Sequence, residues 1–347
     1  MKHISNVLVF LLITTVLMIG VLESVYRFQI IDTYNPELQA FNPDNILDDD
    51  ESTTILALGD SFTAGNNSYP VTLRNNLDGY RVINSGISGT GINEALLIAP
   101  HRFLDFKPSI FIYQIYVGND LMNIRYPVNW NTLSLQRNMY WTLIRYVRSL
   151  AYLNYRLSQV SDMNIHKNVK DSESSVEKYT HKNVKDSEFS VEKYTKRWRL
   201  YLQADPEILE DQITITDVYR SEYGYFLEQL NKLLAYCKPA DCTAYVVVIP
   251  HASQVHSKYL GNQKDLGAHF SNPDAIGKTE YPFIMGIRSS LADNNNAIVL
   301  NPLKHLRNME NNGINMYYQN DPHLNPAGQE QIGIFLLERI RFESAHL

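Results

Sequence analysis

A serine placed directly after a buried apolar run is the strongest chemical signal in the sequence. Residues 58–65 read LGDSFTAG, and Ser61 lies at their centre. Glycines on both sides let the chain turn sharply, which exposes the Ser61 hydroxyl and aims backbone N–H groups at a developing oxyanion. The same residues also suit an ordinary strand-to-helix turn in which Ser61 only caps the helix. Alone, the block leaves both readings open.

Three further blocks follow in chain order and supply the other groups that a serine nucleophile needs. Residues 84–89 read NSGISG, residues 118–120 read GND and residues 320–326 read NDPHLNP. They contain glycines that let a substrate approach the backbone, an amide donor, and a carboxylate beside a histidine. A serine, a histidine base and a carboxylate that orients it are the components of acyl transfer by nucleophilic catalysis.

The elements that must position these blocks are five short apolar strands. They are expected at residues 53–58, 81–84, 110–117, 243–249 and 297–300. The runs are apolar throughout, which is typical of strands covered by helices on both faces. Helical stretches lie between and after them, at residues 70–77, 93–103, 218–236, 283–294 and 326–342. This alternation predicts a doubly wound α/β fold with a parallel five-stranded sheet, whose carboxyl edge carries all four blocks.

The four blocks, in this order, resemble the SGNH/GDSL hydrolase family, and in particular its bacterial branch. The matching stretches are GDSFTAGNNSYPVTL, VINSGISGTG, YVGNDL and DPHLNPAG. The likeness covers most of residues 54–341 but leaves out the middle of the chain. It implies a three-layer α/β/α, flavodoxin-like fold and a serine hydrolase that acts on ester bonds without a cofactor.

The resemblance also assigns roles to individual residues. Ser61 would be the nucleophile, His323 the general base and then acid, and Asp321 the residue that orients the imidazole and stabilises its cation. The oxyanion hole would consist of the backbone N–H groups of Ser61 and Gly89 and the side-chain amide of Asn119.

The last block departs from the commonest family spacing, in which an aspartate lies three residues before the histidine. Asn320 holds that position, and Asp321 lies two residues before His323, as in several cell-envelope members of the family. We expect Asp321 to be the third triad member, because an amide cannot stabilise the imidazolium as a carboxylate does; Asn320 is the alternative. Similarly, Gly86 is the alternative to Gly89.

Other polar residues near the blocks have plainer interpretations. Asp60 and Asp120 are expected to hold the turns together through hydrogen bonds. His251 and His256 follow the fourth strand and could face the cleft, but loop histidines are commonly just solvated. The sequence has no HExxH motif and no acidic cluster at ligand spacing, so we expect no metal.

The first residues predict a membrane anchor. The run from Ile4 to Leu22 is uncharged, follows Lys2 and is about long enough to span a bilayer. Positive charge before the run and acidic residues after it place the body on the extracytoplasmic side of the membrane. A cleaved signal peptide is the alternative, but the run lacks an A-x-A-like site. We expect an anchor at 1–28, a linker at 29–52 and the hydrolase domain at 53–347.

The hydrolase domain is interrupted by a helical or irregular insertion at about 121–217. It contains a tandem duplication, residues 166–180 and 181–195, whose copies differ only at Ser174 and Phe189. Two copies of a polar unit are too few for a solenoid, whereas a long exposed loop adds little closure entropy. We interpret the duplication as a neutral insertion.

Bulk composition excludes some functions and leaves others open. The net charge is −6, so no basic surface for nucleic acid is expected. The two cysteines, Cys237 and Cys242, either form a small disulfide outside the cytoplasm or remain free thiols. Nothing in the sequence indicates an oligomeric state.

The combined prediction is a membrane-anchored serine esterase that removes an acyl group, acetyl above all, from an ester. An envelope carbohydrate is the favoured carrier of that ester, and a lipid is the other. The alternatives are an O-acyltransferase to a sugar hydroxyl, or a catalytically silent protein for envelope assembly or carbohydrate binding.

Overall fold

A computed structural model describes most of the chain in two compact units. The described residues are 2–48, 52–125, 139, 142–144, 146–157, 198, 202, 205–240, 242–319 and 321–344. Residues 1–31 and 127–190 belong to the first unit, and residues 32–126 and 191–347 to the second. The sheet and all candidate site residues lie in the second unit.

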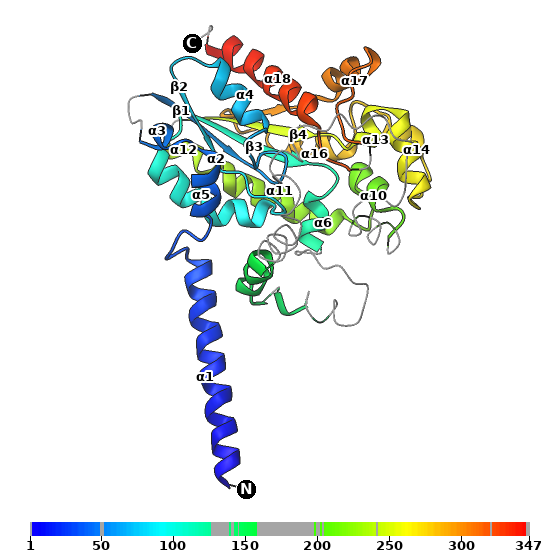
Figure 1. The fold of residues 1–347 in the computed structure, drawn as a ribbon. Coiled ribbons are helices and arrows are strands. Elements are labelled where there is room, and N and C mark those ends of the chain that lie inside the picture. Colours follow the sequence, from blue (N-terminus) through cyan, green and yellow to red (C-terminus); the bar gives the residue numbers. More distant parts are fainter. Residues whose placement is uncertain are drawn as a thin grey trace, which may run out of the picture. The chain divides into compact units, whose positions relative to one another are not determined.

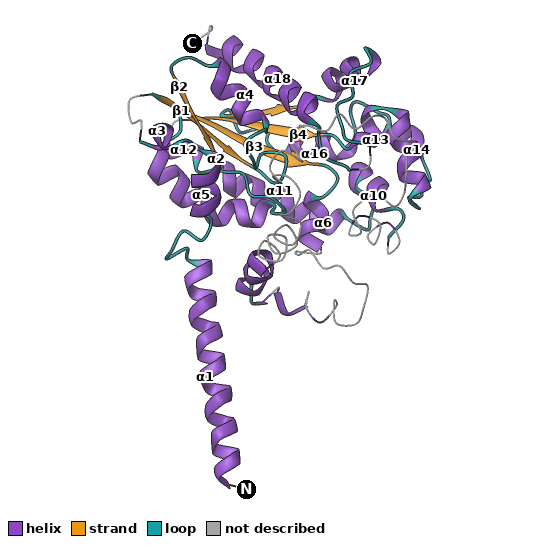
Figure 2. Ribbon diagram, in the orientation of Figure 1, coloured by secondary structure: helices purple, strands orange, loops and turns teal. Residues whose placement is uncertain are grey.

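A parallel five-stranded sheet forms the centre of the second unit (Figure 2). In space the strand order is β2-β1-β3-β4-β5. The bounds are β1 (Thr53–Leu58), β2 (Tyr80–Asn84), β3 (Ile110–Tyr116), β4 (Thr243–Ile249) and β5 (Ala297–Leu300). The predicted parallel α/β fold is confirmed, with the bounds of three strands as expected and the other two within one residue.

Helices cover both faces of the sheet, which gives the predicted three layers (Figure 1). One layer contains α4 (Tyr69–Asn76) and α18 (Pro326–Ser344). The other contains α5 (Ile92–Phe106), α11 (Arg220–Leu234) and α16 (Pro282–Ser290). Because both faces are covered, the inner strands are buried almost throughout, whereas the edge strand β5 is fully buried only at Leu300.

The stretch between residues 29 and 52, predicted to be a linker, contains two short helices. These are α2 (Asn35–Phe41) and α3 (Asp44–Leu47). Hydrogen bonds hold the segment against the sheet: Asn42 between the helices donates from its side chain to the Asn84 carbonyl at 2.8 Å and accepts from the Asn84 N–H at 2.8 Å. Leu38 of α2 is buried.

Several shorter helices complete the second unit. They are α6 (Asp120–Arg125), α10 (Ile208–Thr214), α12 (Cys237–Ala240), α13 (Ala252–Val255), α14 (Ser257–Asp265), α15 (Pro273–Ile276) and α17 (Leu303–Asn311). Two of them, α6 and α10, fall inside the range expected for the insertion but belong to the same compact unit as the sheet. The duplicated residues 166–195 lie outside the described residues.

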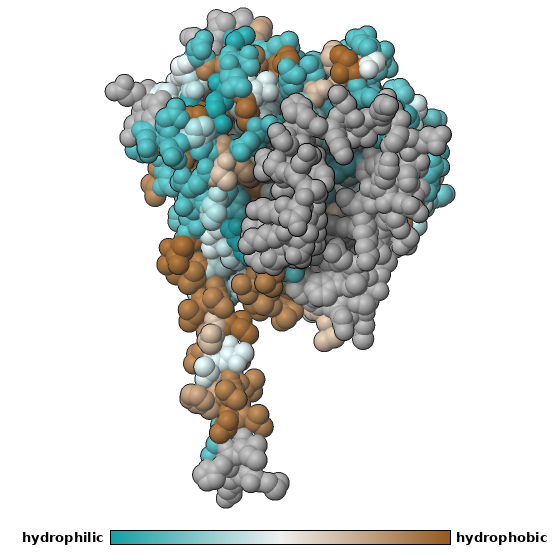
Figure 3. All heavy atoms as spheres, viewed as in Figure 1, coloured by the Kyte–Doolittle hydropathy of each residue, from teal (hydrophilic) through white to brown (hydrophobic). Residues whose placement is uncertain are grey.

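The first unit begins with α1 (Lys2–Arg27). Within the described residues, the stretch Asn6–Arg27 of this helix is the one long and apolar enough to cross a membrane, with a mean hydropathy of 2.4. Its apolar side chains are exposed, and Figure 3 shows α1 with a mostly hydrophobic surface. Residues 149–157 of the same unit are also helical.

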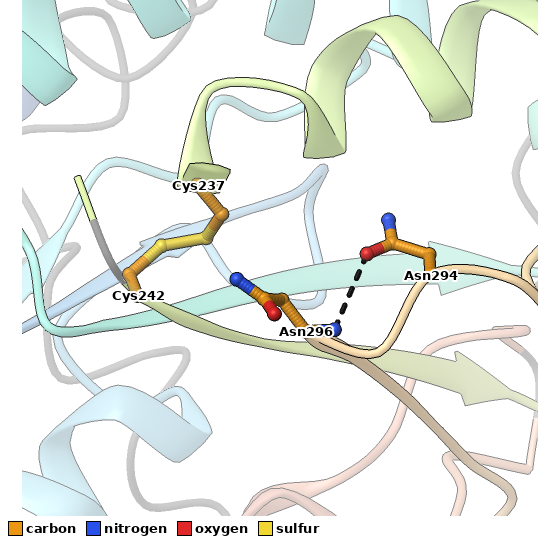
Figure 4. The surroundings of a disulfide bond; sticks show 4 residues. All are labelled: Cys237, Cys242, Asn294 and Asn296. Carbon is orange, nitrogen blue, oxygen red and sulfur yellow. Dashed lines mark hydrogen bonds between the residues drawn. A yellow bond between two sulfur atoms is a disulfide. The ribbon is translucent and has the colours of Figure 1, made fainter. Parts of the chain in front are cut away.

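Cys237 and Cys242 form a disulfide just before β4 (Figure 4). The bond ties the start of α12 to the residue that precedes the strand. Beside it, the Ala244 N–H donates to the Asn296 carbonyl at 2.7 Å, in the turn that leads into β5. The sequence left a disulfide and two free thiols open, and the structure pairs the cysteines. The bond lies at the amino end of β4, whereas the candidate site lies at the carboxyl ends of the strands.

Candidate active site

Ser61 lies in a tight turn directly after β1. The N–H groups of Thr63 and Ala64 both donate to the Asp60 carbonyl, at 3.1 and 2.9 Å, so the chain completes one helical turn. The turn does not continue directly into a helix, because Gly65 adopts a φ of 103° and redirects the chain. The next helix along the chain, α4, begins four residues after Gly65.

The end of β2 and the loop that follows it hold this turn in place. The Asn84 side chain donates to the Thr63 and Gly65 carbonyls at 2.9 and 3.1 Å, and accepts from the Gly86 N–H at 3.0 Å. Gly86 packs so closely that a Cβ atom there would lie 2.5 Å from the Ala64 nitrogen. Gly86 is therefore needed for close approach, and its N–H group is already occupied.

His323 joins Ser61 to Asp321. The Ser61 Oγ lies 2.7 Å from the His323 Nε2, within hydrogen-bond distance. On the other side of the ring, His323 Nδ1 is hydrogen-bonded to the Asp321 Oδ1, which also accepts from the His323 backbone N–H at 2.9 Å. The structure thus brings together the three residues predicted to form a triad. Asn320, the alternative to Asp321, lies outside the described residues.

The loop that carries Asp321 and His323 is closed like a small hairpin. The Tyr318 N–H donates to the His323 carbonyl at 3.1 Å, and the Asn325 N–H donates to the Met316 carbonyl at 3.0 Å. Between these bonds, residues 317 and 324 form an isolated antiparallel bridge. This pairing fixes the backbone on both sides of His323. The loop therefore holds the imidazole ring in a defined position.

Aromatic rings pack around the histidine. Phe62 stacks on the His323 ring at 5.1 Å between ring centres and contacts Tyr116 at 4.3 Å. The Tyr116 hydroxyl donates to the Pro322 carbonyl at 3.4 Å. These contacts join the Ser61 turn, the end of β3 and the histidine loop, which limits how far the imidazole can rotate away from Ser61.

The hydrogen bonds to Asp321 favour its charged form. Burial raises the pKa of Asp321, but the hydrogen bonds and charge of His323 outweigh burial, and the pKa is lowered overall. The lowered pKa keeps the Asp321 carboxylate ionised near neutral pH. Both side chains are accessible, 37% for Asp321 and 41% for His323, so a substrate can reach the pair.

Three candidate oxyanion donors lie in the loops after β1, β2 and β3. The backbone N–H groups of Ser61 and Gly89 have no hydrogen-bond partner among the described residues. Gly89 is exposed and adopts a φ of 76°, which suits glycine. The Asn119 amide donates one hydrogen to the Asp60 Oδ2 at 2.9 Å. Its second hydrogen remains for another acceptor.

Asp60 and Asp120 hold the turns together, as predicted. Asp60 accepts from the Phe62 N–H at 3.0 Å as well as from Asn119, and Asp120 accepts from the Tyr116 N–H at 2.6 Å. Burial raises the pKa of Asp60, and burial together with the charge of Asp60 raises the pKa of Asp120. Both carboxyls thus brace loops from within the protein instead of acting on substrate.

His251 and His256 each cap a helix, and His251 also stacks on Tyr116 at 6.0 Å between ring centres. His251 is fully buried, contrary to the expectation of a solvated loop residue, because its Nδ1 accepts from the Ser253 N–H at 3.1 Å and caps α13. His256 caps the next helix by accepting from the Lys258 N–H at 3.1 Å. Within the described part of the chain, no group of three or more His, Cys, Asp or Glu residues is arranged to hold a metal.

No protein-family model and no curated protein matches the chain. Among solved structures, a catalytic mutant of an acetylxylan esterase from Geobacillus stearothermophilus is 11% identical, covers 83% of this chain and 94% of its own, and has a TM-score of 0.43. A GDSL-like lipase from Bacteroides thetaiotaomicron is 12% identical, with 90% and 97% covered and a TM-score of 0.41. An alpha/beta hydrolase enzyme from the metagenome of Lake Arreo, Spain, is 12% identical. The match covers 82% of this chain and 94% of that one, with a TM-score of 0.40. These values are too low to carry an argument about this chain.

Sequence reasoning missed several residues that support the site. Phe62 and Tyr116 stack beside His323, and Asn84 and Gln114 hold the Ser61 turn, Gln114 by accepting from the Asp60 N–H at 3.1 Å. Gln114 gave a signal, because a polar residue inside an otherwise apolar strand must find a buried partner. The aromatic stack gave none, because Phe62 and Tyr116 look like ordinary core residues in the sequence.

Proposed function

We propose that this protein is a serine esterase that works through an acyl-Ser61 intermediate. The observation that carries the proposal is the chain of contacts from the Ser61 Oγ through His323 to Asp321. A hydroxyl bonded to an imidazole, whose other nitrogen is bonded to a carboxylate, is the arrangement that activates a serine for attack on an ester carbonyl.

In the first half of the reaction, the Ser61 Oγ attacks the ester carbonyl while the His323 Nε2 takes the serine proton. Asp321 keeps the Nδ1 protonated, which leaves Nε2 free to act as the base, and stabilises the imidazolium that forms. The carbonyl oxygen becomes an oxyanion and accepts from Ser61, Gly89 and Asn119. When the tetrahedral intermediate collapses, His323 returns the proton to the leaving alcohol and the acyl group stays on Ser61.

In the second half, water attacks the acyl group while His323 again acts as the base. The same donors stabilise the second oxyanion, and collapse releases the carboxylic acid and restores the Ser61 hydroxyl. If a sugar hydroxyl took the place of water, the same residues would transfer the acyl group instead of hydrolysing the ester. Nothing in the described site favours that outcome over hydrolysis.

We propose further that α1 is an uncleaved anchor and that the catalytic unit works outside the cytoplasm. The exposed apolar surface of α1 supports a membrane span, and the lack of an A-x-A-like site supports an uncleaved one. The disulfide supports the second point, because such bonds persist in oxidising compartments. An enzyme held there would meet acyl esters on envelope carbohydrates or lipids. An O-acetylated carbohydrate is the substrate class that we favour, on the family resemblance and this location.

A fluorophosphonate probe tests the catalytic proposal directly, because it reacts with activated serines. The full chain should be labelled at Ser61 and should hydrolyse p-nitrophenyl acetate, whereas Ser61→Ala should do neither. Ser68→Ala is a matched control, because Ser68 lies seven residues further on and bonds backbone carbonyls. Absence of labelling in the folded wild-type chain would favour a catalytically silent binding protein. Acylated acceptor formed in the presence of glycans would instead assign a transferase.

Extraction of membranes at alkaline pH tests the anchor. The full chain should remain in the membrane pellet, and a chain lacking residues 1–28 should be released. A full-length product that is released by the same treatment would show that α1 does not span the bilayer.

A further inference from the structure

We propose that the described residues between 139 and 157 form a second membrane contact, which lies on the surface of the bilayer spanned by α1. The proposal rests on the anchor proposed above and adds a surface and its partner, a lipid headgroup layer. The described residues of this segment are 139, 142–144 and 146–157, and they belong to the same compact unit as α1.

The segment is bonded to the last turn of α1. The Glu23 carboxylate accepts from the backbone N–H groups of Arg148 and Ser149, at 2.9 and 2.8 Å. Arg27 donates to the Tyr146 carbonyl at 2.9 Å. These bonds cap the start of the helical residues 149–157 with a residue of α1, so the segment is attached to one end of the helix.

A ring contact adds to these bonds. Tyr26 stacks on Tyr152 at 5.4 Å between ring centres. Ile144 and Ser149 are buried at 2% and 5% exposure, so one face of the segment packs inward. The attachment thus involves both backbone and side chains.

The position of these bonds along α1 sets their depth in a bilayer. The uncharged run ends at Leu22, and the bonded residues are Glu23, Tyr26 and Arg27. At about 1.5 Å rise per residue, they lie roughly 2–8 Å beyond the end of that run. The polar layer on each side of the hydrocarbon core is about 5–8 Å thick. The contacts between α1 and residues 146–152 therefore lie at the level of the headgroups.

The outward face of the segment is apolar. Its exposed large side chains are Met139, Leu143, Tyr146, Leu153 and Leu157, and Tyr146 and Leu157 reach 74% and 67% exposure. Leu153 and Leu157 are four residues apart within the helical residues 149–157, so they lie on one face of that helix. Met139, Leu143 and Tyr146 come before the break at residues 147–148 and are spaced four and three residues apart. Apolar side chains gathered on one face mark a binding surface for lipid or protein.

Apolar residues at the end of α1 add to this surface. Phe28, Ile30 and Ile31 follow the helix and are 75%, 67% and 66% exposed. α1 ends at Arg27 and the chain turns at Gln29, which has a φ of 44°, so these residues stay near the headgroup-level end of the span. Lipid can cover apolar side chains there without a protein partner. Their continuity with α1 is the reason to assign the segment to lipid.

The polar residues of the segment fit the same partner. The Arg156 guanidinium lies over the rings of Tyr152 and Tyr155, at 5.1 and 5.2 Å from the ring centres, and donates to the Tyr152 hydroxyl at 2.9 Å. Arginine and tyrosine are favoured at membrane interfaces, where the charge meets phosphate and the ring enters the boundary. The segment thus combines an apolar face with interfacial side chains.

Depth-dependent quenching in vesicles tests the proposal on the full chain. Because Cys237 and Cys242 form a disulfide, a cysteine introduced at Val16, Thr142, Leu143 or Leu153 is the one thiol available for a polarity-sensitive dye. The vesicles contain phosphatidylcholine and phosphatidylglycerol with a nitroxide at the headgroup or deep in the acyl chain. Circular dichroism checks that each labelled variant folds.

We expect the Val16 probe to be quenched mainly by the deep nitroxide, and the Leu143 and Leu153 probes mainly by the shallow one. Thr142, one helix position away from Leu143, should be quenched less than its neighbour. Quenching at Val16 with aqueous-like emission at Leu143 and Leu153 would keep the anchor and overturn the second contact. Probes at Leu143 and Leu153 that are shielded from iodide but insensitive to both nitroxides would assign the face to a protein. No quenching at Val16 would overturn the anchor itself.

Discussion

Two loops at the carboxyl edge of the sheet each carry a histidine, and they use it differently. In the loop after β4, the His251 Nδ1 lies 2.7 Å from the Ser253 Oγ, and the ring is fully buried. In the loop before α18, the His323 Nδ1 faces Asp321 and the ring is partly exposed. Both partners lie two residues from their histidine, so spacing alone does not separate the two loops.

The difference lies in what each ring nitrogen meets. The His251 Nε2 is buried without a partner among the described residues, and burial lowers the pKa of His251 to about 3, so the ring stays neutral. The His323 Nε2 is hydrogen-bonded to the Ser61 hydroxyl. The Asp321 carboxylate on the other side of the ring can stabilise the charged imidazolium. A histidine can work as a base only where both forms are accommodated.

The comparison predicts its largest contrast for the histidines themselves. His323→Gln should lower kcat by about 10⁶, the order measured when the base of a serine hydrolase triad is removed. His251→Gln should leave kcat within a few-fold, because that ring does not touch the reacting groups. Steady-state hydrolysis of p-nitrophenyl acetate by both variants measures the contrast. Equal losses in two folded variants would show that the two loops do not differ as described.

The partners on Nδ1 should give the next largest contrast. Asp321→Asn should lower kcat by about 10⁴ with little change in folding, because an amide cannot stabilise the imidazolium. Ser253→Ala should leave kcat nearly unchanged, and Asn320→Ala should cost far less than Asp321→Asn. The reverse ranking of Asn320→Ala and Asp321→Asn would mean that another group orients His323.

The loop after β3 should show an intermediate effect. Asn119→Ala removes one expected donor to the oxyanion and should lower kcat by about 10²–10³, with a smaller change in KM. Asn123→Ala is a matched control one helical turn further on, where the side chain donates to the Thr90 carbonyl at 3.3 Å. An unchanged kcat in Asn119→Ala would remove Asn119 from the oxyanion hole.

His251 should reveal itself in stability instead of rate. Its pKa in the folded protein is lowered to about 3, so between about pH 6.5 and pH 3 the unfolded chain binds a proton that the folded chain does not. The free energy of unfolding should therefore fall as the pH falls through this window, by up to about 1.4 kcal/mol per pH unit from this residue. His251→Gln should flatten that slope in urea titrations. An unchanged slope would show that His251 titrates normally.

The duplicated segment should matter least. Deletion of residues 181–195, one copy of the repeat, should leave esterase turnover within a few-fold, because a polar loop can shorten with little change in closure entropy. Circular dichroism and p-nitrophenyl acetate hydrolysis of the deletion variant are sufficient measurements. Complete loss of activity in a folded variant would show that the repeat shapes the site.

Local patterns in the sequence were enough to predict the sheet and to find the residues that meet at its edge. The strands around Ile55 and Val246 are uninterrupted apolar runs, and such runs predict that both faces of a strand are buried. Ser61 and His323 were found because each lies in a short block with unusual chemistry. Their contact depends on how five strands and the loop around His323 are placed in space. The sequence shows the order of these elements but not the distance between Ser61 and His323.

What the sequence did not reveal depends on contacts between distant residues. The turn at Ser61 ends at Gly65, and Asn84 from the neighbouring strand β2 donates to the carbonyls of Thr63 and Gly65. The short helices α2 and α3 are joined to the sheet through the bonds between Asn42 and Asn84. No local pattern in the sequence identifies Asn84 as the partner of Asn42. The burial of His251 likewise follows from packing around it, since a histidine after a strand is compatible with either environment.

The 262 positions that separate Ser61 from His323 have a consequence for biosynthesis. The serine leaves the ribosome early, together with the first strand, whereas the histidine follows the last strand. If α1 is the anchor and Ser61 the nucleophile proposed above, a nascent chain inserted in a membrane carries Ser61 for most of its synthesis without His323. On this proposal, esterase activity begins only when the loop around His323 has been made and has packed against Phe62 and Tyr116. The proposed mechanism therefore predicts that a growing chain does not attack esters in the compartment where it is made.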